Sequence, residues 1–263
     1  MQEIHRESPN KGYRRIRDDL DKYYHTPVND KRTLRICRGL GIQSVVKHAP
    51  HGCTRAASSP RQLAENVLDR QFYADRPNEK WLTDVTEFHY YTGTNMRKLY
   101  LSAILDLCDR RIVSFVIRDT NDAALVHRTL AQALEGNPGA RPLLHSDRGS
   151  AYTTQIFHDK LAAAGITQSM SRVGKCIDNG PMEGFWGILK RERYYGRRFT
   201  SREQLVKMIQ EYITYYNFHR LQRGLGVRTP MEVHDRLLAA YAPSTIWYAG
   251  GFSCVKCNYS LST

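Results

Sequence analysis

The order of β-rich and helical runs beyond residue 77 constrains the fold more than any other feature of this chain. In chain order the runs lie at 81–86, 99–105 and 112–117 (β-rich), 121–135 (helical), 143–147 (β-rich), 153–165 (helical) and 166–170 (β-rich). Only turn signals separate the first three, whereas helices separate the later strands. Hairpin-linked strands run antiparallel and helix-linked strands run parallel, so this order predicts one mixed sheet with helices on both faces.

The predicted fold is therefore α/β, a ribonuclease H-like mixed five-stranded sheet with flanking helices. In such a sheet the first and fourth strands are neighbours. Asn121 is the expected cap of the first helix, and Thr153 or Thr154 begins the second. Beyond the sheet, the segment 200–203 has the pattern of a capping box for a helix reaching about Asn217, and Pro230 begins another helix.

The N-terminal segment carries two helical patterns, at 12–24 and 31–40, joined by a turn. It is rich in Arg and Lys, which favours a helix-turn-helix-like DNA-binding unit, although a solvated basic hairpin has the same pattern. The candidate DNA contacts here are Arg14, Arg15, Arg35 and Arg38. We divide the chain into this helical segment (1–45), a linker with a short helix near 62–68 (46–76), the catalytic core with C-terminal helices (77–240) and a tail (241–263).

The charge balance restricts the partner. The chain has 39 Lys and Arg against 26 Asp and Glu, a net charge of +13 that favours a polyanion. No run approaches the roughly 18 apolar residues that span a bilayer, and no basic amphipathic helix stands out, so nucleic acid is favoured over a membrane. Nothing at the N-terminus resembles a signal peptide, and the six cysteines have no framework spacing, so we expect a cytoplasmic protein without disulfides.

Three carboxylates occupy informative positions in the predicted sheet. Asp84 lies in the first strand, Asp147 closes the fourth, and Glu183 begins a helix after a glycine-rich segment. Neighbouring strands bring the two aspartates together, and the glutamate approaches from the helix. Converging carboxylates hold the pair of hard divalent cations that phosphodiester cleavage or joining uses, which predicts Asp84, Asp147 and Glu183 as catalytic metal ligands.

Other readings of these acids were weighed. A single acid at a strand end or helix start is usually a cap or a solvated charge. Asp106, Asp109 and Asp178 are rival ligands, for which we expect turn or cap roles. His145, Ser146 and Asp147 cannot form a hydrolase triad, because adjacent residues of a strand point to opposite faces.

Basic residues accumulate after Glu183. Residues 184–230 contain ten Lys or Arg against three acids, so we expect this region to follow a DNA backbone. The candidate contacts are Lys190, Arg191, Arg197 and Arg198. Lys190 follows Glu183 by seven on the same helix face and could contact a phosphate, or be an ordinary surface lysine. For the interleaved aromatics we expect packing, with base stacking as the alternative.

Several motifs together resemble one family. They are Trp81-Leu82-Thr83-Asp84-Val85-Thr86, His145-Ser146-Asp147-Arg148-Gly149-Ser150-Ala151-Tyr152, Asp178-Asn179-Gly180-Pro181-Met182-Glu183 and Tyr215-Tyr216-Asn217-Phe218-His219-Arg220. They are similar to the integrase core of bacterial insertion-sequence transposases of the DDE class, most closely the second-frame protein of insertion-sequence family three. That family places 35 residues between the second Asp and the Glu, as between Asp147 and Glu183, and a basic residue seven after the Glu, as Lys190 is. Cys176-Ile177 and Leu221-Gln222-Arg223 depart from its usual pattern.

The resemblance implies an activity. Asp84, Asp147 and Glu183 would be the catalytic triad of a Mg²⁺-dependent transposase that hydrolyses the element's end and transfers the freed 3′-hydroxyl strand to another phosphodiester. Mn²⁺ suits the same oxygen ligands. Double-stranded DNA, a homodimer or higher assembly that pairs two ends, and an upstream helix-turn-helix and leucine-zipper protein or fusion are the expected partners.

Two other functions remain open from the sequence. The chain could be a catalytically inert or regulatory DNA-binding remnant, or a nuclease of the same fold. Cys254 and Cys257 form a single CxxC pair in a tail of unknown role, and His48, His51 and Cys53 are isolated, so neither group predicts zinc.

Overall fold

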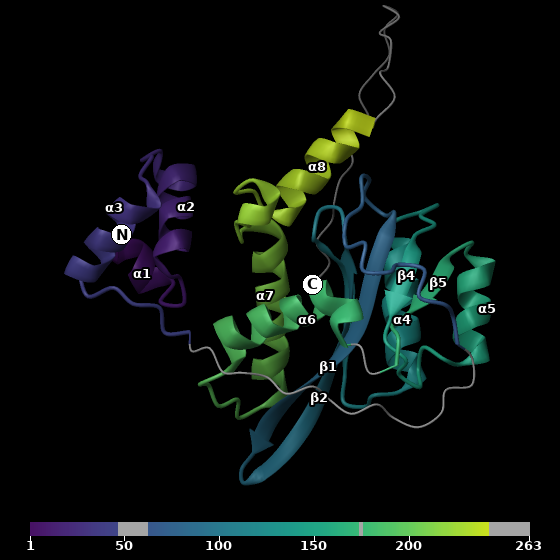
Figure 1. Cartoon of the computed structure of the whole chain (residues 1–263). Coiled ribbons are helices and arrows are strands. Elements are labelled where there is room, and N and C mark those ends of the chain that lie inside the picture. Colours follow the sequence, from purple (N-terminus) through teal and green to yellow (C-terminus); the bar gives the residue numbers. More distant parts are fainter. Residues whose placement is uncertain (47–62, 174–175, 242–263) are drawn as a thin grey trace, which may run out of the picture.

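The computed structural model describes residues 1–46, 63–173 and 176–241 (Figure 1). Within these ranges the strands are β1 (Lys80–Thr92), β2 (Asn95–Asp106), β3 (Ile112–Arg118), β4 (Leu143–Ser146) and β5 (Thr167–Met170), in the sheet order β3-β2-β1-β4-β5. β2 is antiparallel to β1 and β3, whereas β4 is parallel to β1 and β5. The mixed sheet is confirmed, as is the pairing of the first strand with the fourth.

The α-helices among the described residues are α1 (Gln2–Glu7), α2 (Tyr13–Tyr24), α3 (Asp30–Gly39), α4 (Ala123–Glu135), α5 (Gln155–Ala163), α6 (Gly180–Leu189), α7 (Arg202–Phe218) and α8 (Pro230–Tyr241). Two 3-10 turns, η1 (Cys176–Asn179) and η3 (Arg223–Leu225), and a π-helical turn, η2 (Lys190–Tyr194), connect the later helices. α1 was not predicted. It is held by Ile4, the buried residue through which this short helix joins α2 and α3.

The two faces of the sheet bury different helices because strand side chains alternate. Leu82 and Phe88 of β1 pack on one face against Phe185 of α6 and Ile209 of α7. Trp81 packs on the other face, against α4 and α5. Figure 1 shows α6 and α7 together beside the long β1–β2 hairpin, with α5 on the far side of β5. The ribonuclease H-like arrangement predicted from the chain order is therefore present.

The β1–β2 hairpin extends well beyond the predicted strands, to Thr92 paired with Asn95 around a turn at Gly93. Tertiary contacts support the extension. The Tyr91 N–H donates to the Phe199 carbonyl, and Tyr194 packs edge-on against Phe88 with the ring centroids 5.0 Å apart. Residues after α6 therefore stabilise the outer parts of β1 and β2, which local sequence periodicity does not identify as strand.

Two helix starts differ by one residue from the prediction. Asp122, not Asn121, caps α4 by accepting the Leu125 N–H at 3.0 Å. At α7 the cap is Ser201, and Gln204 reaches back to Thr200 in place of the predicted Glu203. Thr154 caps α5, and Thr229 and Glu232 form a reciprocal capping box at α8.

The predicted short helix in the linker is wrong over the described positions 63–68, which have no helical structure. The backbone there bonds to β5 instead. Met170 N–H donates to the Glu65 carbonyl, and Leu68 N–H donates to Ser169 Oγ. Pairing with a distant strand therefore overrides the local helix propensity.

The N-terminal helices have a small core of their own, formed by Ile4, Ile16, Leu20 and Cys37. Figure 1 places them beside α7 and α8. The contacts across this boundary include several ion pairs, described below.

Candidate active site

Asp84 lies near the middle of β1 and is half-buried. Its Oδ2 accepts a hydrogen bond of 2.9 Å from the Trp186 indole. Burial, together with the neighbouring charge of Asp147, raises the pKa of Asp84 to about 7. A nearby cation would stabilise the ionised form of Asp84, because the negative charge at this site is not compensated.

Asp147 and Glu183 come from two other elements. Asp147 follows β4 directly, where its Oδ1 accepts the Gly149 N–H at 2.9 Å. Glu183 lies in the first turn of α6 with its side chain exposed. Desolvation raises the pKa of both carboxyl groups. Both charges also act on Asp84, so the three carboxylates share one electrostatic environment.

The three carboxylates do not form a closed cage. Over residues 1–46, 63–173 and 176–241, no three His, Cys, Asp or Glu side chains are close enough together to hold a metal ion as they stand. The donor set nevertheless fits a hard divalent cation, since all three donors are carboxylate oxygens with raised pKa values. The three carboxylates would have to move closer together when a cation binds.

Two hydrogen bonds hold α6 against β1, at Thr83 and at Asp84. One is the Trp186 bond to Asp84 itself, and the other runs from Asn179 Nδ2 to the Thr83 carbonyl at 3.2 Å. Sequence reasoning assigned Trp186 to packing and missed its contact with Asp84. No local signal distinguishes a tryptophan that packs from one that also donates to a residue in a distant strand.

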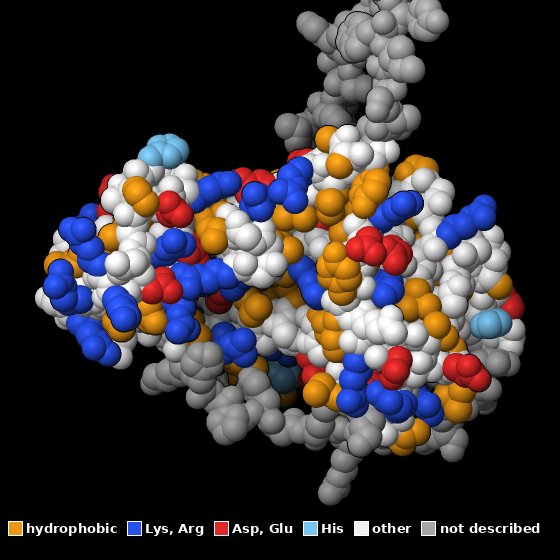
Figure 2. Space-filling model, turned by 45° about the horizontal axis from the view of Figure 1, so that its top comes forward, with side chains coloured by type: hydrophobic (Ala, Val, Ile, Leu, Met, Phe, Trp, Pro, Cys, Tyr) orange, Lys and Arg blue, Asp and Glu red, His pale blue; other side chains and the backbone are white. Residues whose placement is uncertain are grey.

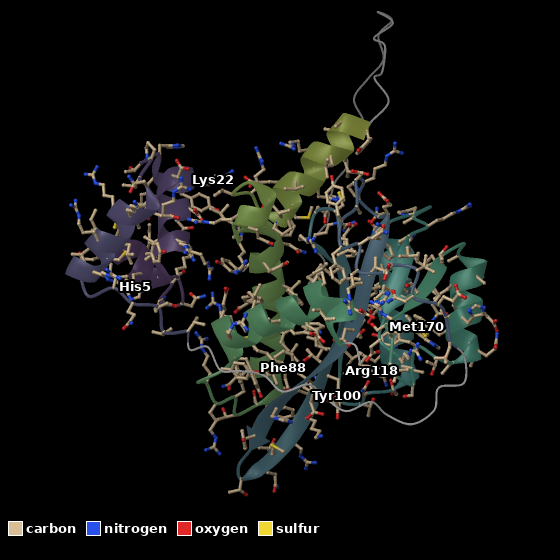
Figure 3. All side chains as sticks on the ribbon, viewed as in Figure 1. His5, Lys22, Phe88, Tyr100, Arg118 and Met170 are labelled. Atoms are coloured by element: carbon tan, nitrogen blue, oxygen red, sulfur yellow. The ribbon has the colours of Figure 1, made fainter. Side chains whose placement is uncertain are left out.

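Lys190 is the first residue after α6 and the first of the π-helical turn η2, and its backbone is still helical, with φ −63° and ψ −42°. The wider spacing of the π-helix begins only after Lys190, so the backbone is compatible with the predicted common face of Glu183 and Lys190. The Lys190 ammonium lies 5.1 Å from the centre of the Phe88 ring, which Figure 3 labels on the hairpin beside α6. Burial lowers the pKa of Lys190, while the charge of Asp84 raises it.

Comparison with known proteins decides the family. Integrase core domain families match residues 74–176 and 164–230, and an HTH-like domain family matches residues 1–50. An uncharacterized transposase-like protein of Haemophilus influenzae is 40% identical, over 80% of this chain and 95% of its own length. The putative transposase InsK for insertion sequence element IS150 of Escherichia coli is 37% identical, over 90% of this chain and 82% of its own length.

The chain belongs to the insertion-sequence transposases with an integrase core. The fold has a distant structural likeness as well. A chain in the cryo-electron microscopy structure of the simian T-cell lymphotropic virus intasome, in complex with a PP2A regulatory subunit, aligns with a TM-score of 0.53 at 17% identity. The alignment covers 92% of this chain and 80% of that one. For the N-terminal helices, the HTH-like match also favours a helix-turn-helix-like unit over a solvated basic hairpin.

The three acids that were alternative candidates for metal ligands in this transposase, Asp106, Asp109 and Asp178, bind other groups of the protein. Asp106 accepts the N–H groups of Asn78 and Cys108, and Asp109 accepts that of Arg111, as expected for turn residues. Asp109 also contacts His234 of α8 at 2.7 Å. Asp178 lies in the 3-10 turn η1, as expected, and accepts the Arg172 N–H, but its carboxylate is also a buried ion-pair centre bound by the side chains of Arg172 and Arg70.

The hydrolase triad is excluded as predicted. The His145 ring is fully buried between the hydroxyl groups of Ser169 and Ser171, on β5 and just beyond it, away from Asp147. Burial lowers the pKa of His145 to about 4, so the ring is neutral at neutral pH. It has a packing role in the transposase core.

The candidate DNA contacts on the N-terminal helices differ in whether their side chains are hydrogen-bonded to the core. Arg14, Arg35 and Arg38 are exposed on the N-terminal helices, over which Figure 2 shows many Lys and Arg side chains. Arg15 is engaged, because its guanidinium donates to Glu192 at 2.7 Å and to the Tyr215 hydroxyl at 2.8 Å. We therefore withdraw Arg15 as a DNA contact.

The basic residues after Glu183 are partly engaged. Arg191 lies against the backbone at Gly187, and Arg198 lies over the Tyr91 ring with 4.7 Å between its guanidinium and the ring centre. Arg197 is exposed at the turn before α7. The aromatics of this region pack on one another, as the 4.7 Å contact of Tyr216 with Phe185 illustrates.

Two further sequence features lie where no structure is described. His48, His51 and Cys53, and the pair Cys254 and Cys257, fall outside the described residues. In the described part of the chain, no helix is both long and apolar enough to cross a bilayer.

Proposed function

We propose that this transposase cleaves the ends of its element and transfers the 3′-hydroxyl strand to a target phosphodiester by two-metal-ion catalysis. The observation that carries the proposal is the common environment of Asp84, Asp147 and Glu183, which come from β1, the end of β4 and the start of α6. Three carboxylates that converge from three elements are the oxygen donors that a dinuclear phosphodiester site uses.

Asp84, Asp147 and Glu183 would hold Mg²⁺, with Mn²⁺ able to substitute. When bound, the two cations would supply activation of the attacking oxygen and charge stabilisation at the leaving oxygen. The protein side chains would hold the reacting groups in position. Lys190, beside Asp84, would contact a phosphate adjacent to the reacting bond.

Double-stranded DNA would contact two regions. The helix-turn-helix-like unit offers Arg14, Arg35 and Arg38 for the element's ends, and the segment after α6 offers Lys190 beside Asp84, Arg191, and Arg197 and Arg198 toward the tip of the β1–β2 hairpin. Pairing two ends requires a homodimer or higher assembly on the DNA. We also propose that an upstream helix-turn-helix and leucine-zipper protein, or a fusion with it, contributes end recognition.

The proposal is tested by Mg²⁺- or Mn²⁺-dependent nicking and strand joining on labelled duplexes that carry the element's ends. Glu183→Gln keeps the shape of the side chain but removes its charge, so metal-dependent products should fall by more than about 100-fold, beyond the loss typical of residues around a metal site. The control is Glu135→Gln, which removes an exposed charge at the end of α4 on the other face of the sheet.

Each result has a distinct meaning. Joined strands that are lost in Glu183→Gln and kept in Glu135→Gln support the transposase, whereas cleavage without joining indicates a nuclease of the same fold. If the wild-type chain gives no products, alone or with its upstream partner, while still binding DNA, it is an inert DNA-binding remnant.

A further inference from the structure

Trp186 contacts the candidate active site directly. Its indole N–H donates to Asp84 Oδ2 at 2.9 Å, and the residue is only 6% exposed. It lies on α6 three residues after Glu183, so the two side chains are neighbours on the helix surface. One helix therefore carries both a candidate ligand and a donor to another candidate ligand.

Trp186 is the side-chain donor to the Asp84 carboxylate, which also accepts a backbone hydrogen bond at Val85. The terminal torsion of an Asp side chain is broad, so an unheld carboxylate samples many orientations. An indole N–H can only donate, and it carries no charge. It therefore fixes Asp84 without neutralising it, whereas a Lys or Arg in that place would compete with the cation.

The same bond also fixes the position of α6 relative to β1. Asn179, which is 4% exposed, donates to the carbonyl of Thr83 at the start of the helix, and Trp186 bonds to Asp84 about two turns later. The helix is thus held to β1 both before and after Glu183. The Trp186 bond therefore sets how closely Glu183 approaches Asp84.

We propose that Trp186 is a positioning residue of the metal site: its indole N–H orients Asp84 and holds Glu183 in register with it. This inference rests on the proposed function, because it takes Asp84 and Glu183 as ligands of a divalent cation. It goes beyond that function by assigning a role to a residue that neither binds the cation nor contacts DNA in the proposal.

The test is the affinity of the full-length chain for Mn²⁺ alone, measured by electron paramagnetic resonance of the free ion. Trp186→Phe should weaken Mn²⁺ binding by about 10- to 100-fold, the range seen when a residue that orients a metal ligand is lost. The matched control is Trp81→Phe. Trp81 is fully buried, and its indole N–H has no hydrogen-bond partner among the described residues, so this change removes comparable packing without breaking a bond.

A second variant separates the hydrogen bond from packing if Trp186→Phe disturbs the fold. Benzothienylalanine at position 186 keeps the shape of tryptophan but replaces the N–H with sulfur. We expect it to bind Mn²⁺ as weakly as Trp186→Phe while unfolding at the wild-type temperature. Wild-type affinity in this variant would overturn the proposal.

The proposed function fails in a different way. If Glu183→Gln binds Mn²⁺ as well as the wild type does, or if the wild type binds none, the metal site itself is wrong and the role of Trp186 falls with it. If the wild type binds Mn²⁺ and Glu183→Gln does not, the metal site stands, and only the position 186 variants decide the inference.

Discussion

Single carboxylates in this chain have different roles because their surroundings differ. Asp84 and Asp178 are both shielded from water, yet their pKa values move in opposite directions. Burial and the charge of Asp147 raise the pKa of Asp84, whereas hydrogen bonds from Arg172 lower that of Asp178 well below its usual range. An acid already neutralised by two arginines has little to gain from a cation. Asp178 is thus a structural residue beside the candidate site.

Asp178→Asn tests this role through stability. Asp178 accepts from Arg172 at 2.9 and 3.0 Å and from Arg70 at 2.7 Å. Removing its charge should lower the free energy of unfolding by about 2–3 kcal/mol at neutral pH, the range for hydrogen bonds to charged groups. Urea unfolding of the two proteins measures the difference.

The effect of Asp178 should depend on pH in a definite direction. Its pKa is lowered in the folded state, so its stabilisation is fully present above the unfolded value near 3.8 and is lost as pH falls through the folded value. The difference between wild type and Asp178→Asn should therefore shrink from about pH 5 downward. A difference that stays constant over that range would contradict this account.

At the scale of elements, the π-helical turn η2 orients residues in two directions. Lys190 packs on Phe88 of β1, while Glu192 points to the other side and accepts from Arg15 of α2, from Arg220 and from Tyr212 of α7. A regular α-helix would change the relative directions of these side chains. This turn therefore connects the candidate active site to the contact with the N-terminal helices.

Glu192→Gln should destabilise this junction, because it leaves Arg15 and Arg220 without their shared counter-charge. The Glu192 side chain is 7% exposed, so we expect a loss of about 3 kcal/mol, the lower end for breaking a buried ion pair. Urea unfolding measures the loss, and hydrogen exchange locates it at η2 and α2. Glu203→Gln, an exposed acid on α7, is the control and should change stability by less than about 0.5 kcal/mol. Equal stability of the two variants would refute the role of Glu192.

At the scale of the whole molecule, ion pairs connect the N-terminal unit to the core. Arg223 binds Asp18 at 2.9 Å and Asp30 at 2.9 Å, and Lys22 binds Glu232 of α8. Figure 3 labels Lys22 on the side of α2 that faces α8. The Arg223–Asp30 and Lys22–Glu232 pairs are exposed and are therefore weakened by salt, so the docking of this unit should depend on ionic strength.

Arg223→Ala should loosen this docking without unfolding either part. Its side chain is 40% exposed, but Asp18 is only 4% exposed and keeps Arg17 as a partner, so the loss should be about 1–3 kcal/mol. Small-angle X-ray scattering should show the radius of gyration rising at a lower salt concentration than in the wild type. Lys207→Ala, which removes a 77% exposed charge from α7, is the control. A radius of gyration that is the same in both variants at every salt concentration would count against an ionic interface.

DNA binding is also a property of the whole molecule. Replacing Arg197 and Arg198 together by Ala should reduce the slope of log affinity against log salt by up to about two, since each phosphate contact contributes roughly 0.9. Binding isotherms over a range of salt concentrations measure the slope. An unchanged slope would remove the segment before α7 from the proposed DNA path.

The sequence by itself determined the sheet and the candidate carboxylates. Three strands joined by turns run antiparallel and strands joined by helices run parallel, and in the ribonuclease H-like topology that this order predicts, β1 and β4 are neighbours, as observed. Asp84 in β1 and Asp147 directly after β4 are then brought to neighbouring positions. The helix start that carries Glu183 is likewise visible in the local pattern.

Only the tertiary structure decided which side chains meet across the chain. The bond between Trp186 and Asp84 joins residues 102 positions apart, and that between Arg15 and Glu192 joins residues 177 apart. The extended segment at 63–68 pairs with β5, and the change to a π-helical turn follows Leu189. Local propensity carries no information about a partner that far away, because the free energy of such a contact arises only when the packed core brings the two segments together.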